Sequence, residues 1–157
     1  MTDVTVADLE TVPLFRGLPG DELARLAEPA TRRRLADGEV LFEQGQPARN
    51  LYVVVSGSVL LRTGETLTSV IVDNLGPGDL VGWSAMRENA MTLSTGIAAG
   101  PAEVVAIPVE PIIELVTSGS AGSRTLFQRI VGLAAGHLDA AWGQLLQVGR
   151  EGPITGG

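Results

Sequence analysis

Residues Leu41–Leu61, with the sequence LFEQGQPARNLYVVVSGSVLL, decide the fold of this chain. A short apolar segment runs into Gly45, a polar loop follows, and Gly57 separates two extended runs rich in valine and leucine. β-Branched residues favour strands, and glycine accepts the positive φ that tight turns require. The pattern therefore predicts chain reversals at Gly45 and Gly57 between short strands, which is typical of a β roll.

The same kind of segment recurs along the chain, separated by Gly, Pro, Asp or Asn. Eight short strands at this spacing favour an antiparallel roll. They are expected at Arg32–Leu35, Glu39–Phe42, Leu51–Val55, Val59–Arg62, Leu67–Asn74, Leu80–Val81, Thr92–Ala98 and Glu103–Pro108.

Helices are expected on both sides of the strands. They are predicted at Val4–Val12, Pro19–Ala27, Pro111–Val116 and from about Ser123 to Val148. The predicted fold class is α+β, with an eight-stranded antiparallel β roll, similar to a jelly roll, flanked by N-terminal helices and a long C-terminal helix. A chain of 157 residues can bury its own core, so we expect one domain over residues 1–157. Its N-terminal helices would occupy 4–28, the roll 31–108 and the C-terminal helices 111–148.

The long C-terminal helix carries two apolar stripes. One is a heptad seam, in which apolar residues are alternately four and three positions apart. The seam consists of Phe127, Val131, Ala134, Leu138, Ala141 and Leu145 and continues to Val148. Leu126, Ile130 and Leu133 form a second stripe that can pack on the chain's own core. We therefore expect a homodimer through the seam; the alternative is a helix that packs only on its own roll.

Composition excludes several classes of function. All 11 basic residues are arginine, against 18 acidic residues, and the net charge of −7 disfavours nucleic acid and anionic membranes as partners. The consecutive Arg32–Arg34 would point to both faces of a strand, so they indicate a solvated edge rather than a phosphate-binding patch. There is no leader-like opening and no apolar run of about 20 residues, so we expect a cytoplasmic protein.

The sequence also lacks the residues that most catalytic or metal sites need. It has no cysteine, one histidine, and no GxSxG, P-loop or HExxH motif. We therefore expect no catalytic residues, no metal site and no enzyme activity.

The order of the motifs resembles that of a known family. LFxxGxxxxxLYxVxxGxVxL, followed by LGPGDLVG at residues 75–82, is similar to the cyclic-nucleotide-binding domain family, the regulatory module of catabolite-activator-type regulators and of kinase regulatory subunits. The resemblance extends from about Leu14 to the end of the chain. Transcription factors of this family continue into a helix-turn-helix, which we do not expect here.

The resemblance also implies a ligand-binding cassette, in which the family pattern is F-G-E-x-A-L, a short loop, and P-R-x-A. The Glu binds the ribose 2′-hydroxyl, and the Arg pairs with the phosphate beside a short helix N-terminus. In this chain Gly82, Ala85 and Met86 match, whereas Trp83 replaces the Glu and Thr92 replaces the Arg. Loss of the Arg pair is expected to cost about 3 kcal/mol or more, so cyclic AMP or cyclic GMP would bind weakly.

The candidate ligand residues are those of the cassette and its exit: Gly82, Trp83, Ser84, Ala85, Arg87, Thr92, Ser94 and Thr95. Two alternatives stay open within this set. Arg87 could supply the missing positive charge. The Trp83 side chain could stack on a flat ligand or fill the vacated pocket, which Ser94 and Thr95 would then line with hydroxyl groups.

These features favour a stand-alone, homodimeric regulatory or adaptor module with altered or lost cyclic-nucleotide binding. A degenerate structural module, serving dimerisation or docking on a larger assembly, is the alternative from another class. A haem-based sensor that uses His137, with Trp142 near it on the same helix, is a third and minor alternative. The sequence does not identify a protein partner.

Overall fold

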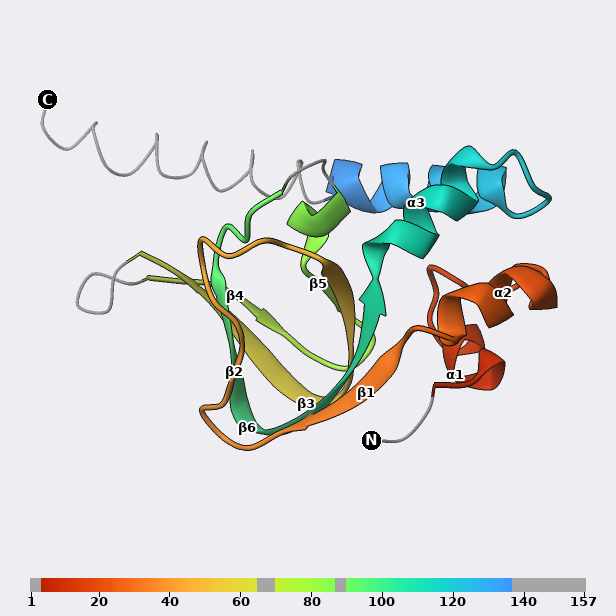
Figure 1. Cartoon of the computed structure of the whole chain (residues 1–157). Helices are drawn as coiled ribbons and strands as arrows, with labels where there is room; N and C mark the ends of the chain where they lie inside the picture. The colour runs from red at the N-terminus through yellow and green to blue at the C-terminus, as the bar shows by residue number, and fades with distance from the viewer. Residues whose placement is uncertain (1–3, 65–69, 87–89, 137–157) are drawn as a thin grey trace, which may run out of the picture.

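Two long antiparallel strands, β3 (Asn50–Thr63) and β6 (Thr95–Pro108), form the centre of the fold. The computed structural model describes residues 4–64, 70–86 and 90–136, with only the backbone at Val72, Trp83 and Ser84. β1 (Thr31–Leu35) and β2 (Val40–Phe42) pair with β6, while β4 (Val70–Leu75) and β5 (Leu80–Val81) pair with β3. All pairs are antiparallel. The predicted β roll with flanking helices is confirmed (Figure 1).

The eight predicted strand segments form six strands in the described part of the chain, because two pairs of segments are each continuous. Gly45 has a positive φ in the turn between β2 and β3, as predicted. The prediction of a reversal at Gly57 was wrong. Gly57, with φ +75°, lies inside β3 where the register against β6 shifts between Ser56 and Ser58. It forms a bulge that bends the strand without ending it.

Packing explains why this bulge carries glycine. A Cβ at Gly57 would lie 2.3 Å from the carbonyl oxygen of Pro101 and 2.8 Å from the Cα of Ala102. Strands β3 and β6 therefore approach each other too closely at this point for any side chain.

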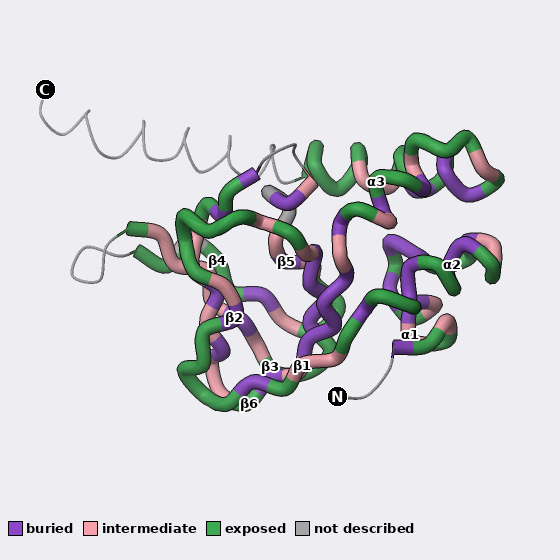
Figure 2. Tube along the Cα trace, in the orientation of Figure 1, coloured by how far each residue is buried: buried purple, intermediate pink, exposed green. Residues whose placement is uncertain are grey.

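The alternation of side chains along β3 creates two apolar cores. Leu51 and Val53 pack towards the helices, whereas Tyr52 and Val54 pack inside the roll. Figure 2 shows the buried segments running through the roll and under the helices. The ring of Tyr52 stacks on that of Phe42, with centroids 5.5 Å apart.

The helices gather at one side of the roll, near where the predictions placed them (Figure 1). They are α1 (Val6–Glu10), α2 (Gly20–Ala27), α3 (Val109–Thr117) and a C-terminal helix described over 123–136. A capping box begins α1: the Thr5 hydroxyl accepts from the Asp8 backbone N–H, and the Asp8 carboxylate accepts from the Thr5 backbone N–H at 2.8 Å.

Polar contacts attach the C-terminal helix to the N-terminal helices. The buried Glu22 carboxylate of α2 accepts from the Gly122 N–H at 3.1 Å, one residue before that helix. Nη1 of Arg129 lies 2.6 Å from the carbonyl oxygen of Arg16 and 3.1 Å from that of Leu14. Together with the fully buried Leu126, these bonds fix the first turns of the helix.

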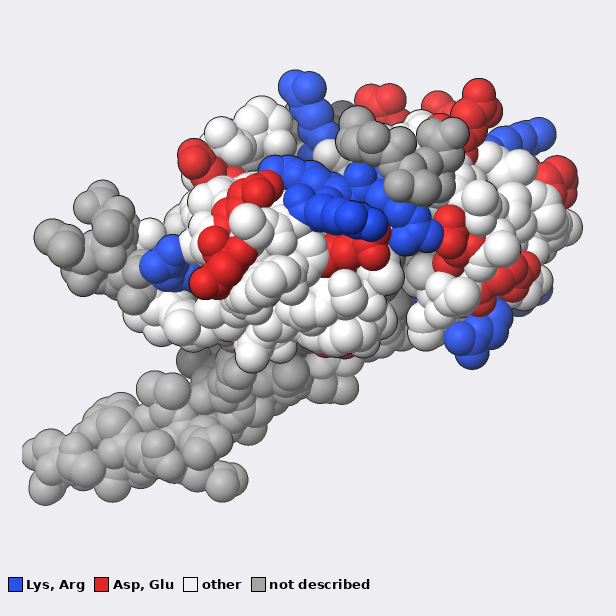
Figure 3. All heavy atoms as spheres, turned by 90° about the horizontal axis from the view of Figure 1, so that it is seen from below, with Lys and Arg blue, Asp and Glu red and all other residues white. Residues whose placement is uncertain are grey.

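The arginines of β1 lie on an edge strand, as predicted. Arg32 pairs with Asp8 at 2.5 Å and lies 3.7 Å from Glu103, while Arg33 lies 3.8 Å from Glu39. Basic side chains do lie together on this face, with acidic side chains around them (Figure 3). The neighbouring carboxylates offset the positive charge. No helix among the described residues is long and apolar enough to cross a bilayer.

Candidate functional site

A cavity of about 180 Å³ lies where the cassette meets the loop before β3. The cassette leaves β5 at Gly82, continues through the 3₁₀ helix η1 (Trp83–Met86) and returns at Thr92 ahead of β6. Gly82 and Thr92 both line the cavity, so the structure brings these two predicted site residues together. The other described residues that line the cavity are Leu41, Phe42, Gln46, Pro47, Ala48, Arg49, Asn50 and Tyr52.

Gly82 is required by its close packing on β3. Its φ is +93°, and a Cβ there would lie 2.9 Å from the carbonyl oxygen of Asn50 and 3.4 Å from the Tyr52 ring. A side chain at this position would push the cassette away from β3. The match to the family at Gly82 therefore has a local physical cause.

The Thr92 hydroxyl is committed to the protein's own loop. It donates to the carbonyl oxygen of Glu43 and accepts from the Gln46 N–H at 3.1 Å, in a residue only 9% exposed. The Thr92 carbonyl oxygen also accepts from the Gly45 N–H at 2.9 Å. The Thr92 side chain, which is predicted to stand where the family has its phosphate-pairing arginine, therefore holds the β2–β3 turn.

The structure does not bring the other described candidates to this cavity. Ala85, with its side chain buried, packs in the core under the helices, where Met86 contacts the same cluster. Thr95 begins β6, and its hydroxyl accepts from the Gln44 N–H at 3.0 Å. Ser94 and Thr95 are half-exposed and do not line the cavity.

Several predictions fall outside the described residues. Arg87 and the side chains of Trp83 and Ser84 lie outside them. That Arg87 supplies the missing charge, and that Trp83 stacks on a ligand or fills the pocket, therefore stay predictions. Also outside are His137, Leu138, Ala141, Trp142, Leu145 and Val148. Within the described half of the seam, Phe127 and Val131 are 53% and 49% exposed, and Ala134 is exposed.

Sequence reasoning missed Arg49. Among the described residues that line the cassette cavity, Arg49 alone is charged. It is also the one basic residue between Arg34 and Arg62 in the sequence, within the loop that precedes the Leu-Tyr motif. That isolation was the signal that could have identified it.

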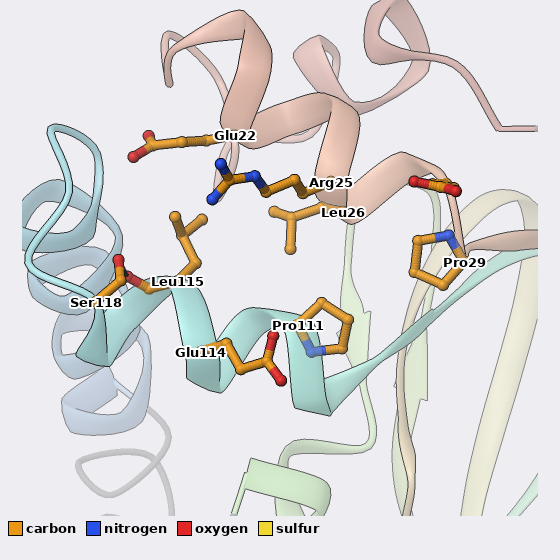
Figure 4. Close-up of a pocket in the computed structure, with 9 residues that line it drawn as sticks. Glu22, Arg25, Leu26, Pro29, Pro111, Glu114, Leu115 and Ser118 are labelled. Carbon is orange, nitrogen blue, oxygen red and sulfur yellow. Dashed lines mark hydrogen bonds between the residues drawn. The ribbon is translucent and has the colours of Figure 1, made fainter.

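A larger cavity of about 750 Å³ lies elsewhere, between α2 and α3. Figure 4 shows Glu22 and Arg25 extending from α2 on one side and Glu114 from α3 on the other. Glu28 also lines it, so three carboxylates face one guanidinium group. This charge balance disfavours a phosphate anion, and none of the described cassette residues lines the space. The smaller cavity is therefore the candidate site.

Comparison with known proteins agrees with the geometry. The cyclic nucleotide-binding domain family model matches residues 32–118, more than half of the 157 residues. The chain is 28% identical over 151 residues to acetyltransferase Pat of Mycolicibacterium smegmatis, covering 96% of this chain and 39% of that protein. It is 28% identical over 131 residues to the cAMP-dependent protein kinase regulatory subunit of Mycosarcoma maydis, covering 83% of this chain and 23% of that protein.

A solved structure shares the fold. The catabolite activator protein of Thermus thermophilus superposes with a TM-score of 0.71 at 25% identity, covering 87% of this chain and 63% of that one. The chain spans less than half of the length of either curated relative. The family match, the roll and the Gly82 cassette together show that the chain belongs to the cyclic nucleotide-binding domain family.

Proposed function

We propose that this chain is a regulatory domain that binds a cyclic nucleotide weakly in the cassette cavity and performs no catalysis itself. The observation that carries the proposal is the position of Gly82. This residue joins β5 to η1 at φ +93°, packs against Asn50 and opens onto a cavity lined by polar groups. This turn geometry serves a cassette that folds over a ligand.

Two features support weak binding. The Thr92 hydroxyl bonds to Glu43 and Gln46, which leaves it little capacity for a ligand, and threonine has no charge to offer a phosphate. The cavity of about 180 Å³ is also smaller than the roughly 300 to 1,000 Å³ of typical ligand pockets. Binding would therefore have to move the cassette outward.

Such a movement could be transmitted to the helices. Ala85 and Met86 of η1 contact the same apolar cluster as Ile112 of α3 and Leu126 and Ile130 of the C-terminal helix. A ligand that binds better to one arrangement of η1 would shift the population of the helix positions packed on it.

The shift in helix positions is proposed to change the contact of this chain with a second copy of itself, through the C-terminal helix. Phe127 and Val131 are large apolar residues on one face of this helix and are about half exposed in the single chain. A partner helix at heptad spacing would cover them.

A second candidate function is a docking module without a ligand. It is favoured by Thr92, whose hydroxyl holds the β2–β3 turn where a family member would pair with phosphate. A haem sensor, the minor alternative, would give the purified protein a strong visible absorption band.

Calorimetry with cyclic AMP and cyclic GMP separates the two main candidates. The regulatory domain gives saturable heat with a Kd of about 100 µM or weaker, equivalent to about −5.5 kcal/mol at that limit. The docking module gives no saturable heat with either nucleotide.

A further inference from the structure

The loop before β3 holds the cassette at both ends. The Thr92 N–H donates to the carbonyl oxygen of Gln46 at 2.8 Å, and the Ala48 N–H donates to that of Ala90 at 2.9 Å. At the other end, Gly82 packs against the carbonyl oxygen of Asn50. Residues 46–50 therefore span the distance between the exit and the entry of the cassette.

Arg49 lies in the middle of this span. Its neighbour Ala48 bonds to the cassette exit, its neighbour Asn50 contacts the cassette entry, and Arg49 itself lines the cavity. The Arg49 carbonyl oxygen accepts from the Val109 N–H at 3.0 Å, which fixes the backbone at this point. The loop thus presents a basic residue to the cavity from a fixed backbone position.

The charge of Arg49 is free for a ligand, as far as the described residues show. Arg32 and Arg33 pair with carboxylates, whereas Arg49 forms no ion pair and no side-chain hydrogen bond within residues 4–64, 70–86 and 90–136. Arg49 is exposed, so its guanidinium group pays no desolvation cost before a ligand arrives. None of the described residues that line the cavity with it is a carboxylate.

We propose that Arg49 pairs with the phosphate of the ligand and so replaces, from the loop before β3, the arginine that the cassette has lost at Thr92. This inference rests on the proposed function and specifies its ligand as a small molecule with a phosphate group, of the size of a cyclic nucleotide. A guanidinium group suits this task because its donors match two phosphate oxygens at once. Because Arg49 is exposed, solvent weakens the pair, in agreement with weak binding.

The test compares cyclic AMP with adenosine, which has the same base and ribose but no phosphate. Arg49→Gln is expected to weaken cyclic AMP binding about three- to tenfold and to leave adenosine binding unchanged within about twofold, both measured by calorimetry. Arg34→Gln is the matched control, because Arg34 is an exposed arginine on β1 that does not line this cavity. It should change neither affinity. Circular dichroism of each variant verifies the fold.

Four results would overturn the inference. Equal cyclic AMP affinity in the native protein and Arg49→Gln refutes the role of Arg49 while leaving the proposed function intact. A tenfold loss in Arg87→Gln, with none in Arg49→Gln, assigns the phosphate to Arg87. If the native protein binds neither cyclic AMP nor adenosine at millimolar concentration, the proposed function fails and the role of Arg49 fails with it. A parallel loss of adenosine binding in Arg49→Gln would show a structural role only.

Discussion

Replacing Thr92 with valine tests whether this residue serves the loop rather than the ligand. Valine has nearly the same shape as threonine but lacks the hydroxyl, which donates to Glu43 and accepts from Gln46 at 3.1 Å. Two neutral hydrogen bonds at a buried position contribute about 2 kcal/mol in total. Glu43 and Gln46 are exposed residues, so water can replace part of these bonds and the net cost should be about 1 to 1.5 kcal/mol.

Urea unfolding measures this cost, and hydrogen exchange locates it. For a domain of this size the melting temperature should fall by about 3 to 5 °C. The Gln46 amide should lose part of its exchange protection, because only its long bond of 3.4 Å to the Glu43 carbonyl oxygen remains, whereas the Gly45 amide, which donates to the Thr92 carbonyl oxygen at 2.9 Å, should keep its protection. Thr95→Val removes a single bond, from Gln44, and should cost about half as much.

Two outcomes would refute this reasoning. Stability and Gln46 protection equal to those of the native protein would mean that the hydroxyl does not hold the turn. A loss of cyclic AMP affinity of tenfold or more, with unchanged stability, would make Thr92 a ligand residue.

Three further predictions concern the strand bulge, the N-terminal cap and the dimer. Gly57→Ala should cost about 3 kcal/mol or more of stability, because it adds the clash with Pro101 to the strain of positive φ. Gly38→Ala, at φ +80° with open space around it, should cost about 1 kcal/mol. Equal losses of stability in urea unfolding would contradict the packing argument. The pKa of Asp8 lies below its ordinary value, mainly because the Asp8 carboxylate accepts from the Thr5 N–H and also because it pairs with Arg32. The ionised carboxylate therefore contributes about 1 kcal/mol to the stability of the fold above pH about 4, and this contribution is lost as the pH falls through the lowered pKa. Asp8→Asn should therefore be less stable than the native protein at pH 7, and this difference should shrink as the pH falls below about 4; a difference in stability that stays constant into acid would exclude this cause. Val131→Asp should convert a dimer into a monomer in sedimentation at micromolar concentration, and a native protein that sediments as a monomer would remove the proposed seam.

The sequence was sufficient for the elements of the fold because their signals are local. Successive side chains of a strand point to opposite faces, so Leu51 and Tyr52 of β3 pack in different cores. Gly57 was misinterpreted because a reversal and a bulge both need a residue at positive φ. Only the approach of Pro101, which is distant in sequence, distinguishes the two.

The candidate site was predictable only in part, for a similar reason. Gly82 and Thr92 belong to one cassette motif, so their positions followed from the order of residues. The Thr92 hydroxyl bonds to the loop before β3, which lies more than 40 residues earlier in the chain and folds against the cassette. Arg49 reaches the cavity because it belongs to this loop. A motif within one segment contains no information on that approach.

The most direct test of the central claim is a calorimetric titration of the native protein with cyclic AMP, repeated with adenosine at equal concentrations. The account predicts saturable binding of cyclic AMP with a Kd of about 100 µM or weaker, and still weaker binding of adenosine, because adenosine lacks the phosphate that Arg49 would hold. No saturable heat from cyclic AMP at concentrations of a few millimolar, on the order of 1 mM or above, would contradict the account, as would a Kd below about 1 µM.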